Sequence, residues 1–169
     1  MKDESEQKGH LDPLWFGGRV DYPSVNRLVD QITELTPEEG MLEVIISSFG
    51  GYNIPAIDFE VWLSRFERKG NLRAIAGTVV ASAGLTLFLG FERRTAIQRS
   101  VLRFHHLSLS SDNNDSMDEL QLKQEELSLI DFVEKRTGFT RAQIKGYMDD
   151  RTSLSGEDLF LLGLCNERL

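Results

Sequence analysis

Three short stretches of this sequence carry residues that could act together on a carbonyl group. Gly50-Gly51 follows an apolar stretch, Ser82 lies among small residues in "GTVVASAG", and His105-His106 end a second apolar stretch. A serine hydroxyl becomes a nucleophile when a base such as histidine accepts its proton. Glycine amides can approach the oxygen that then becomes negative, since no side chain intervenes. The combination indicates acyl transfer by an activated serine.

Each of these features also has an ordinary structural interpretation. A diglycine is common in turns, and a serine at a strand-to-helix junction often caps the helix. Histidines at a strand end are often structural or surface residues. Adjacent residues of a strand point to opposite faces, so at most one of His105 and His106 can meet Ser82. Only the three features together favour a catalytic site.

The stretches that must position these residues alternate between strand and helix patterns. The expected strands are Leu14–Val20, 41–48, 72–80 and one or two within 95–109, and the expected helices begin near Pro23, near Ile54 and after Ser82. The second helix should turn Ile57, Val61 and Phe66 inward. This alternation predicts an α/β fold with a mostly parallel sheet and helices on its faces. Functional groups are then expected at the carboxyl ends of the strands.

The remainder of the chain predicts helices. A long helix over about 117–135 carries Met117, Leu120, Leu127, Ile130 and Val133 near helical spacing. A shorter helix is expected over 140–147, and Ser155 with Asp158 forms a capping-box pattern before a final apolar turn. Residues 1–12 are expected to be a disordered tail, and 13–169 a single domain.

Composition narrows the function classes. A formal net charge of -8 argues against a nucleic-acid partner, because such proteins usually present a basic surface. One cysteine excludes an internal disulfide and a multi-cysteine metal site, in keeping with a reducing, cytoplasmic compartment. The uncharged run 74–91 is nearly long enough to cross a bilayer, but its glycines and β-branched residues favour a buried strand, turn and helix. We therefore expect no membrane segment.

The order of these motifs resembles the proteolytic subunit of the Clp protease, the ClpP family of the crotonase-like superfamily. The resemblance covers about residues 14–164. It is carried by "LWFGGRVDYPSVNRLVDQI", "VIISSFGG", "GTVVASAG", "RSVLRFHH" and the closing "LSGEDLFLLGL". It implies an α/β fold built as a spiral of βαβ units, with the long helix near 117–135 protruding as a handle.

The resemblance also implies a role for each matching residue. Ser82 would be the nucleophile and His105 its general base, while the amides of Gly51 and Ala83 would form the oxyanion hole. The segment after Gly51 would pair with substrate backbone. The implied activity is a serine endopeptidase that hydrolyses peptides or unfolded proteins through an acyl-enzyme, with no metal and no organic cofactor. Stacked homo-oligomeric rings enclosing a chamber, and an AAA+ unfoldase as partner, are implied as well.

One part of the family pattern is out of register. The family's catalytic aspartate stands four positions before the serine of the "LS" segment, and counting back from Ser155 reaches Arg151. Asp150 is one residue away and is the expected third member of the triad, with Asp149 as a further candidate. The glutamine and proline that usually follow the family's histidine are replaced by His106 and Leu107.

Three other functions stay open, one of them a membrane-linked protease of related fold. A catalytically impaired ClpP-like subunit, structural or regulatory, would explain Arg151 at the expected aspartate position. A crotonase-type acyl-CoA enzyme would share the fold and use backbone amides to hold a thioester oxyanion. The acyl-CoA enzyme does not explain why Ser82 and His105 occur together at strand ends.

Overall fold

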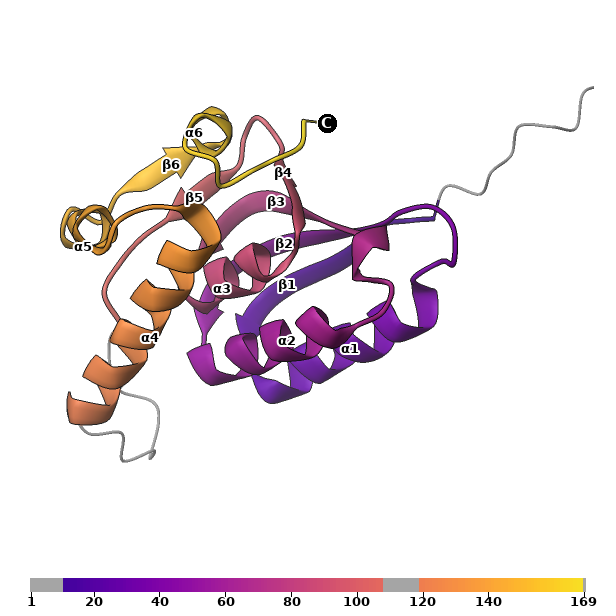
Figure 1. The fold of residues 1–169 in the computed structure, drawn as a ribbon, viewed down its shortest axis with the longest axis horizontal. Helices are drawn as coiled ribbons and strands as arrows, with labels where there is room; N and C mark the ends of the chain where they lie inside the picture. The colour runs from indigo at the N-terminus through magenta and orange to yellow at the C-terminus, as the bar shows by residue number, and fades with distance from the viewer. Residues whose placement is uncertain (1–10, 108–118, 169) are drawn as a thin grey trace, which may run out of the picture.

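The computed structural model of this protein describes residues 11–107 and 119–168. These residues form one six-stranded sheet, parallel except at one edge, together with six α-helices (Figure 1). The expected α/β class is therefore confirmed. Of the predicted tail, residues 1–12, only Leu11 and Asp12 lie within the described residues.

The sheet is built around its third strand. The strands are β1 (Leu14–Val20), β2 (Leu42–Gly51), β3 (Leu72–Ala81), β4 (Arg93–Ala96), β5 (Val101–Arg103) and β6 (Ser153–Ser155). Their order is β1-β2-β3-β5-β6, and β4 pairs with the first half of β3 while β5 pairs with its last residues. Among the strand pairs of the described residues, only β5–β6 is antiparallel. The carboxyl ends of β2, β3 and β5 therefore meet at one edge.

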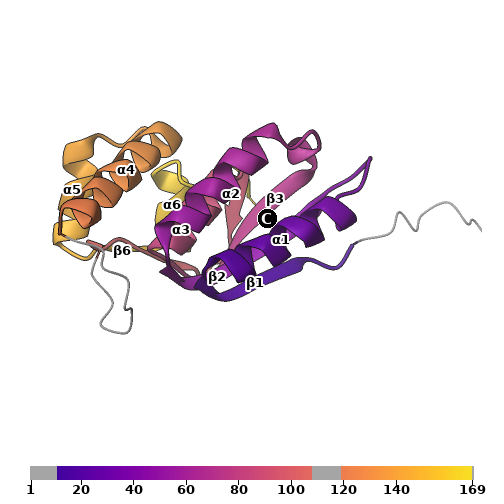
Figure 2. The same ribbon diagram turned by 90° about the horizontal axis from the view of Figure 1, so that it is seen from below.

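Helices α1 (Tyr22–Leu35), α2 (Asn53–Arg65) and α3 (Ala83–Gly90) lie along one face of the sheet, as Figures 1 and 2 show. A 3₁₀ turn, η1 (Lys69–Asn71), leads into β3. In β2, Leu42, Val44 and Ile46 are buried beneath these helices, and the intervening residues are only half-buried. Helix α3 is buried along its whole length. The uncharged run thus forms the core of the sheet and its central helix.

The inward face predicted for α2 is wrong for Val61, which is 45% exposed, and Ile57 is only half-buried. Phe66, just after the helix, is half-buried and packs against the core. The helix instead buries Asn53, Pro55, Ala56, Phe59 and Leu63. Apolar residues occur all around this helix, so their spacing selects no single face. The side against α3 is set by tertiary packing.

Helices α4 (Glu119–Thr137) and α5 (Arg141–Asp149) pack against each other and project beyond the end of the sheet in Figure 1. Ile130 and Val133 are buried as predicted, whereas Leu120 and Leu127 are 64% and 47% exposed. Met117 lies outside the described residues. The long helix was therefore predicted correctly, but Leu120 and Leu127 stay exposed within the described chain.

The last described residues lie beside β4. Helix α6 (Gly156–Leu161) begins with the predicted capping box of Ser155 and Asp158. The amides of Asn166 and Glu167 both donate to the carbonyl of Arg94, at 3.0 Å. Next to them Cys165 is 4% exposed, and burial raises the pKa of its thiol to about 12. This packing attaches the last described segment to the sheet.

In the ranges that the structure describes, no helix combines the length and apolar character needed to cross a membrane.

Candidate active site

Ser82 occupies a sharp turn between β3 and α3. Its φ of 52° and ψ of −132° lie in a region that residues with a side chain rarely adopt. Such strain costs about 1–3 kcal/mol and persists only where the surroundings enforce it. The Ser82 side chain makes no capping hydrogen bond to α3. The helix-cap interpretation therefore fails, and a strand–turn–helix that presents a serine is the arrangement found in nucleophile elbows.

Gly50 packs directly against Ser82. A Cβ atom at Gly50 would lie 2.4 Å from the Cβ of Ser82 and 2.9 Å from its hydroxyl oxygen. Gly50 also has a φ of +105°. Both the space and the backbone conformation require glycine, and this contact fixes the end of β2 against the serine.

Ser48 holds the Gly50 turn from within the protein. It is 1% exposed, donates its hydroxyl hydrogen to the carbonyl of Gly18 at 2.5 Å and accepts from the amide of Gly50 at 3.0 Å. A Cβ atom at Gly84 of α3 would lie 3.1 Å from the Cβ of Ser48. Ser48 thus joins β1, β2 and α3. Sequence reasoning missed it, although a serine at the end of an apolar strand, two residues before the diglycine, was the signal available.

Of the two predicted oxyanion donors, Ala83 directly follows the serine, whereas Gly51 lies against Val20 of β1. Gly51 follows Gly50 at the end of β2 and pairs with Val20 of β1. Ala83 is the first residue of α3, so its amide has no partner within the helix, and the helix dipole favours negative charge there. The structure therefore offers the Ala83 amide next to Ser82, and the Gly51 amide stays a predicted donor.

His105 reaches the same edge from the adjacent strand. Arg103 of β5 is the register partner of Ala81, so His105 follows the strand end beside Ser82. His105 is half-buried, and its Nδ1 lies 2.7 Å from the carbonyl oxygen of His106. No hydrogen bond connects His105 to Ser82 within the described residues. The two predicted catalytic residues thus share an edge of the sheet, without a hydrogen bond between them in the described structure.

The predicted acid does not reach His105. Asp150 ends α5 and is exposed, and no hydrogen bond joins it to either histidine in the part of the chain that the structure describes. Arg151, at the expected aspartate position, has a φ of 50°. Asp149 accepts a hydrogen bond from the Nε2 of His106, at 2.7 Å. The aspartate that does bind a histidine is therefore Asp149, and its partner is His106.

His106 lies between two carboxylates. Glu126 of α4 lies 3.1 Å from its Nδ1, opposite the Asp149 contact at Nε2. The hydrogen bonds that His106 donates to Asp149 and to Glu126 raise its pKa, with the bond to Asp149 as the larger cause. Glu126 also accepts from the amide of Leu107, at 3.1 Å. Sequence analysis did not foresee this cluster, because its members come from three separate segments.

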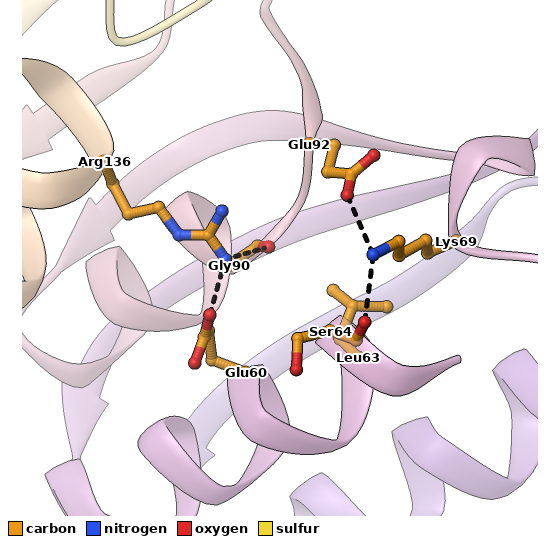
Figure 3. Close-up of a pocket in the computed structure, with 7 residues that line it drawn as sticks. All are labelled: Glu60, Leu63, Ser64, Lys69, Gly90, Glu92 and Arg136. Atoms are coloured by element: carbon orange, nitrogen blue, oxygen red, sulfur yellow. Dashed lines mark hydrogen bonds and ion pairs between the residues drawn. The ribbon is translucent and has the colours of Figure 1, made fainter. Parts of the chain in front are cut away.

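A surface pocket of about 170 Å³ lies elsewhere (Figure 3). Arg136 of α4 donates to Glu60 at 2.6 Å and to the Gly90 carbonyl, while Lys69 contacts Glu92 at 3.2 Å. Its lining residues are Glu60, Leu63, Ser64, Lys69, Gly90, Glu92 and Arg136. All four charged side chains are paired, and none of the predicted catalytic residues lines the pocket.

No cluster of three histidine, cysteine, aspartate or glutamate side chains suited to a metal ion occurs among residues 11–107 and 119–168. Around His106, Glu126 contacts the ring and the amide of Leu107, and Asp149 contacts the other ring nitrogen. A metal ion would have to replace these contacts.

Comparison of the sequence with models of known protein families gave no match, and a search of curated proteins found no significant relative. The ClpP resemblance remains a prediction from the motifs. The geometry around Ser82 stands independently of it.

Proposed function

We propose that this protein is a serine hydrolase of the ClpP type, an endopeptidase that works through an acyl-enzyme. The observation that carries the proposal is the strained backbone of Ser82, held at the sheet edge with Gly50 against its side chain. A serine with a strained backbone, whose hydroxyl caps no helix, contributes little to the stability of the fold. Strain of this kind clusters where chemistry is done.

The proposed reaction uses residues of three strand ends. The Ser82 Oγ attacks the peptide carbonyl carbon while its proton passes to the Nε2 of His105. The amides of Gly51 and Ala83 stabilise the oxyanion, at about 3 kcal/mol for each donor. The imidazolium then gives its proton to the leaving amine, and the acyl-enzyme forms. Water, deprotonated by His105, hydrolyses the ester and restores the serine.

This chemistry requires Ser82 and His105 to come within hydrogen-bond reach. Catalytic hydrogen bonds are often long in a free enzyme and shorten in the substrate complex. His105 lies beyond the end of the short strand β5, which supports a small adjustment there when a peptide binds.

The finer features of the proposal follow the family. We propose that 13–169 is a single domain with the ClpP and crotonase-like spiral, and that cytoplasmic rings of it enclose the active sites. The exposed Leu120 and Leu127 on α4 support burial of this handle helix between copies. Unfolded proteins supplied by an AAA+ unfoldase would be the substrates.

A catalytically impaired, structural or regulatory subunit is the second candidate. It is favoured by the position of Asp150, since that residue bonds neither histidine within the described chain. Loss of the acid lowers turnover by about 10⁴-fold in the template triad. A crotonase-type acyl-CoA enzyme is less well supported, because it gives no use to Ser82 or His105.

Labelling by a fluorophosphonate probe tests the proposal directly. The intact mass of the wild-type chain should rise by one adduct, and Ser82→Ala and His105→Ala should not react. Size-exclusion chromatography with light scattering should accompany the assay, to identify the oligomer that reacts. Absence of an adduct in every oligomeric state would reject the hydrolase and favour the impaired subunit.

A further inference from the structure

A histidine that accepts a proton at Nε2 needs an acceptor at Nδ1. That acceptor fixes the tautomer and supports the imidazolium, which is the task of the aspartate in a serine triad. At His105 the position is filled by the carbonyl oxygen of His106, 2.7 Å away. Because a carbonyl only accepts, Nδ1 must carry the hydrogen, and Nε2 of the neutral ring is left with a lone pair.

The carbonyl that makes this contact belongs to a residue held from two sides. Glu126 on α4 binds the Nδ1 of His106 and the next amide, that of Leu107. Asp149 on α5 binds its Nε2. The His106–Leu107 peptide, whose oxygen faces His105, is therefore attached both through the ring of His106 and through its own N–H.

We propose that the His106 carbonyl replaces the catalytic acid, and that Glu126 and Asp149 position it by clamping the His106 side chain. The active unit is then a Ser82–His105 dyad whose tautomer is set by backbone. This inference rests on the hydrolase function proposed above. It accounts for Arg151 at the position where the family pattern places an aspartate, since no side-chain acid is required there.

His106 itself cannot serve as the base. Both of its ring nitrogens face carboxylates, so the protonated ring donates from both and has no lone pair to offer Ser82. Its role is that of a positioning residue. The base is His105, whose Nε2 is the nitrogen not used by the carbonyl contact.

The clamp depends on the charge of His106. The charged or titratable groups that face it are Glu126 from α4, Asp149 from α5 and, on its own segment, His105. Protonated, the ring makes both contacts, and neutral, it can donate to only one carboxylate. Labelling of Ser82 should therefore decline at alkaline pH, as His106 loses its second proton.

Histidine NMR on the ¹⁵N-labelled protein tests the contact without reference to activity. Neutral His105 should show a protonated Nδ1, and His106 should titrate above the usual histidine value of about 6.5. His105→Gln and His106→Gln assign the signals. A neutral His105 with the proton on Nε2 would overturn the proposal, even if Ser82 reacted normally with the probe.

Labelling kinetics test the clamp. The double variant Glu126→Gln, Asp149→Asn should react about 10- to 100-fold more slowly, as expected when a catalytic group loses its alignment. In this double variant, the decline of the labelling rate at alkaline pH should begin at a lower pH than in the wild type. Glu125→Gln, the neighbouring carboxylate on α4, is the matched control and should leave the rate and the pH profile unchanged.

Asp150→Asn distinguishes the clamp from a conventional triad. Near-complete loss of labelling in Asp150→Asn, with the double variant unaffected, would overturn the proposal in favour of Asp150 as the acid. If wild-type protein never labels but His105 carries its proton on Nδ1, the hydrolase function fails and the backbone contact stands. The two ideas can thus fail separately.

Discussion

The two halves of the candidate site are held in place by different forces. Ser82 is fixed by close packing against Gly50, in a segment without charged residues. His105 and His106 lie at a short strand end and are held by hydrogen bonds, including those that His106 donates to Glu126 and Asp149. Packing is insensitive to salt and pH, whereas exposed ion pairs are sensitive to both. The nucleophile is thus a rigid part of the fold, and the base is the part that conditions can adjust.

The largest loss of folding stability is expected from Gly50→Ala. The new methyl group would overlap Ser82 and would also require a side chain at a φ of +105°. Overpacking costs about 1–3 kcal/mol, and the unfavourable φ adds about 1–2 kcal/mol. The free energy of unfolding, measured by chemical denaturation, should fall by the sum of these two costs.

Gly18→Ala is the matched control for that variant. Gly18 has a φ of +94°, but no atom lies within 4 Å of the place that an added methyl group would take, so only the backbone cost applies. If Gly50→Ala and Gly18→Ala lost the same free energy of unfolding, the contact between Gly50 and Ser82 would not constrain the site.

Ser48→Ala should be the next most damaging change. It leaves the buried Gly50 amide without its acceptor and the Gly18 carbonyl without its donor, which costs about 1–3 kcal/mol for an unsatisfied group. The rate of Ser82 labelling should fall as well, because the glycine turn loses its support. Ser47→Ala, one residue away on β2, serves as the comparison and should change neither quantity appreciably.

A smaller effect separates Ser82→Gly from Ser82→Ala. Both remove the nucleophile, but glycine tolerates a φ of 52° and alanine does not. The glycine variant should be more stable than the alanine variant by about 1 kcal/mol. Thermal unfolding of the pair measures this difference, and a more stable alanine variant would mean that the serine backbone is not strained.

The smallest expected effect on stability comes from the ion pairs of His106. The pKa of His106 is raised in the folded protein, so its stabilising contribution is complete below the unfolded value of about 6.5. It is lost as pH rises through the higher folded value. Because the ring is 47% exposed, we expect less than about 1 kcal/mol. The stability gap between wild type and His106→Gln should shrink from pH 6 to pH 9 and at high salt, and a constant gap would contradict the ion-pair assignment.

Sequence patterns predicted the first half of the site better than the second. The turn at Ser82 lies between a β-branched strand and a helix that adjoin it in the chain, so local signals suffice. The partner of His106 is Asp149, which becomes its neighbour only after α4 and α5 fold back. No periodicity encodes that contact. The inward face of α2 failed for a related reason, because its apolar residues surround the helix and only packing against α3 selects a side.

The burial of Cys165 has a practical consequence. With the only thiol of the chain inside the C-terminal packing and its pKa near 12, the folded protein should react only slowly with alkylating reagents at neutral pH. A cysteine introduced on the surface would then carry a fluorophore without background. The native thiol would meanwhile report each local opening of the segment beside Arg94, so its rate of modification would give the free energy of detaching the C-terminus.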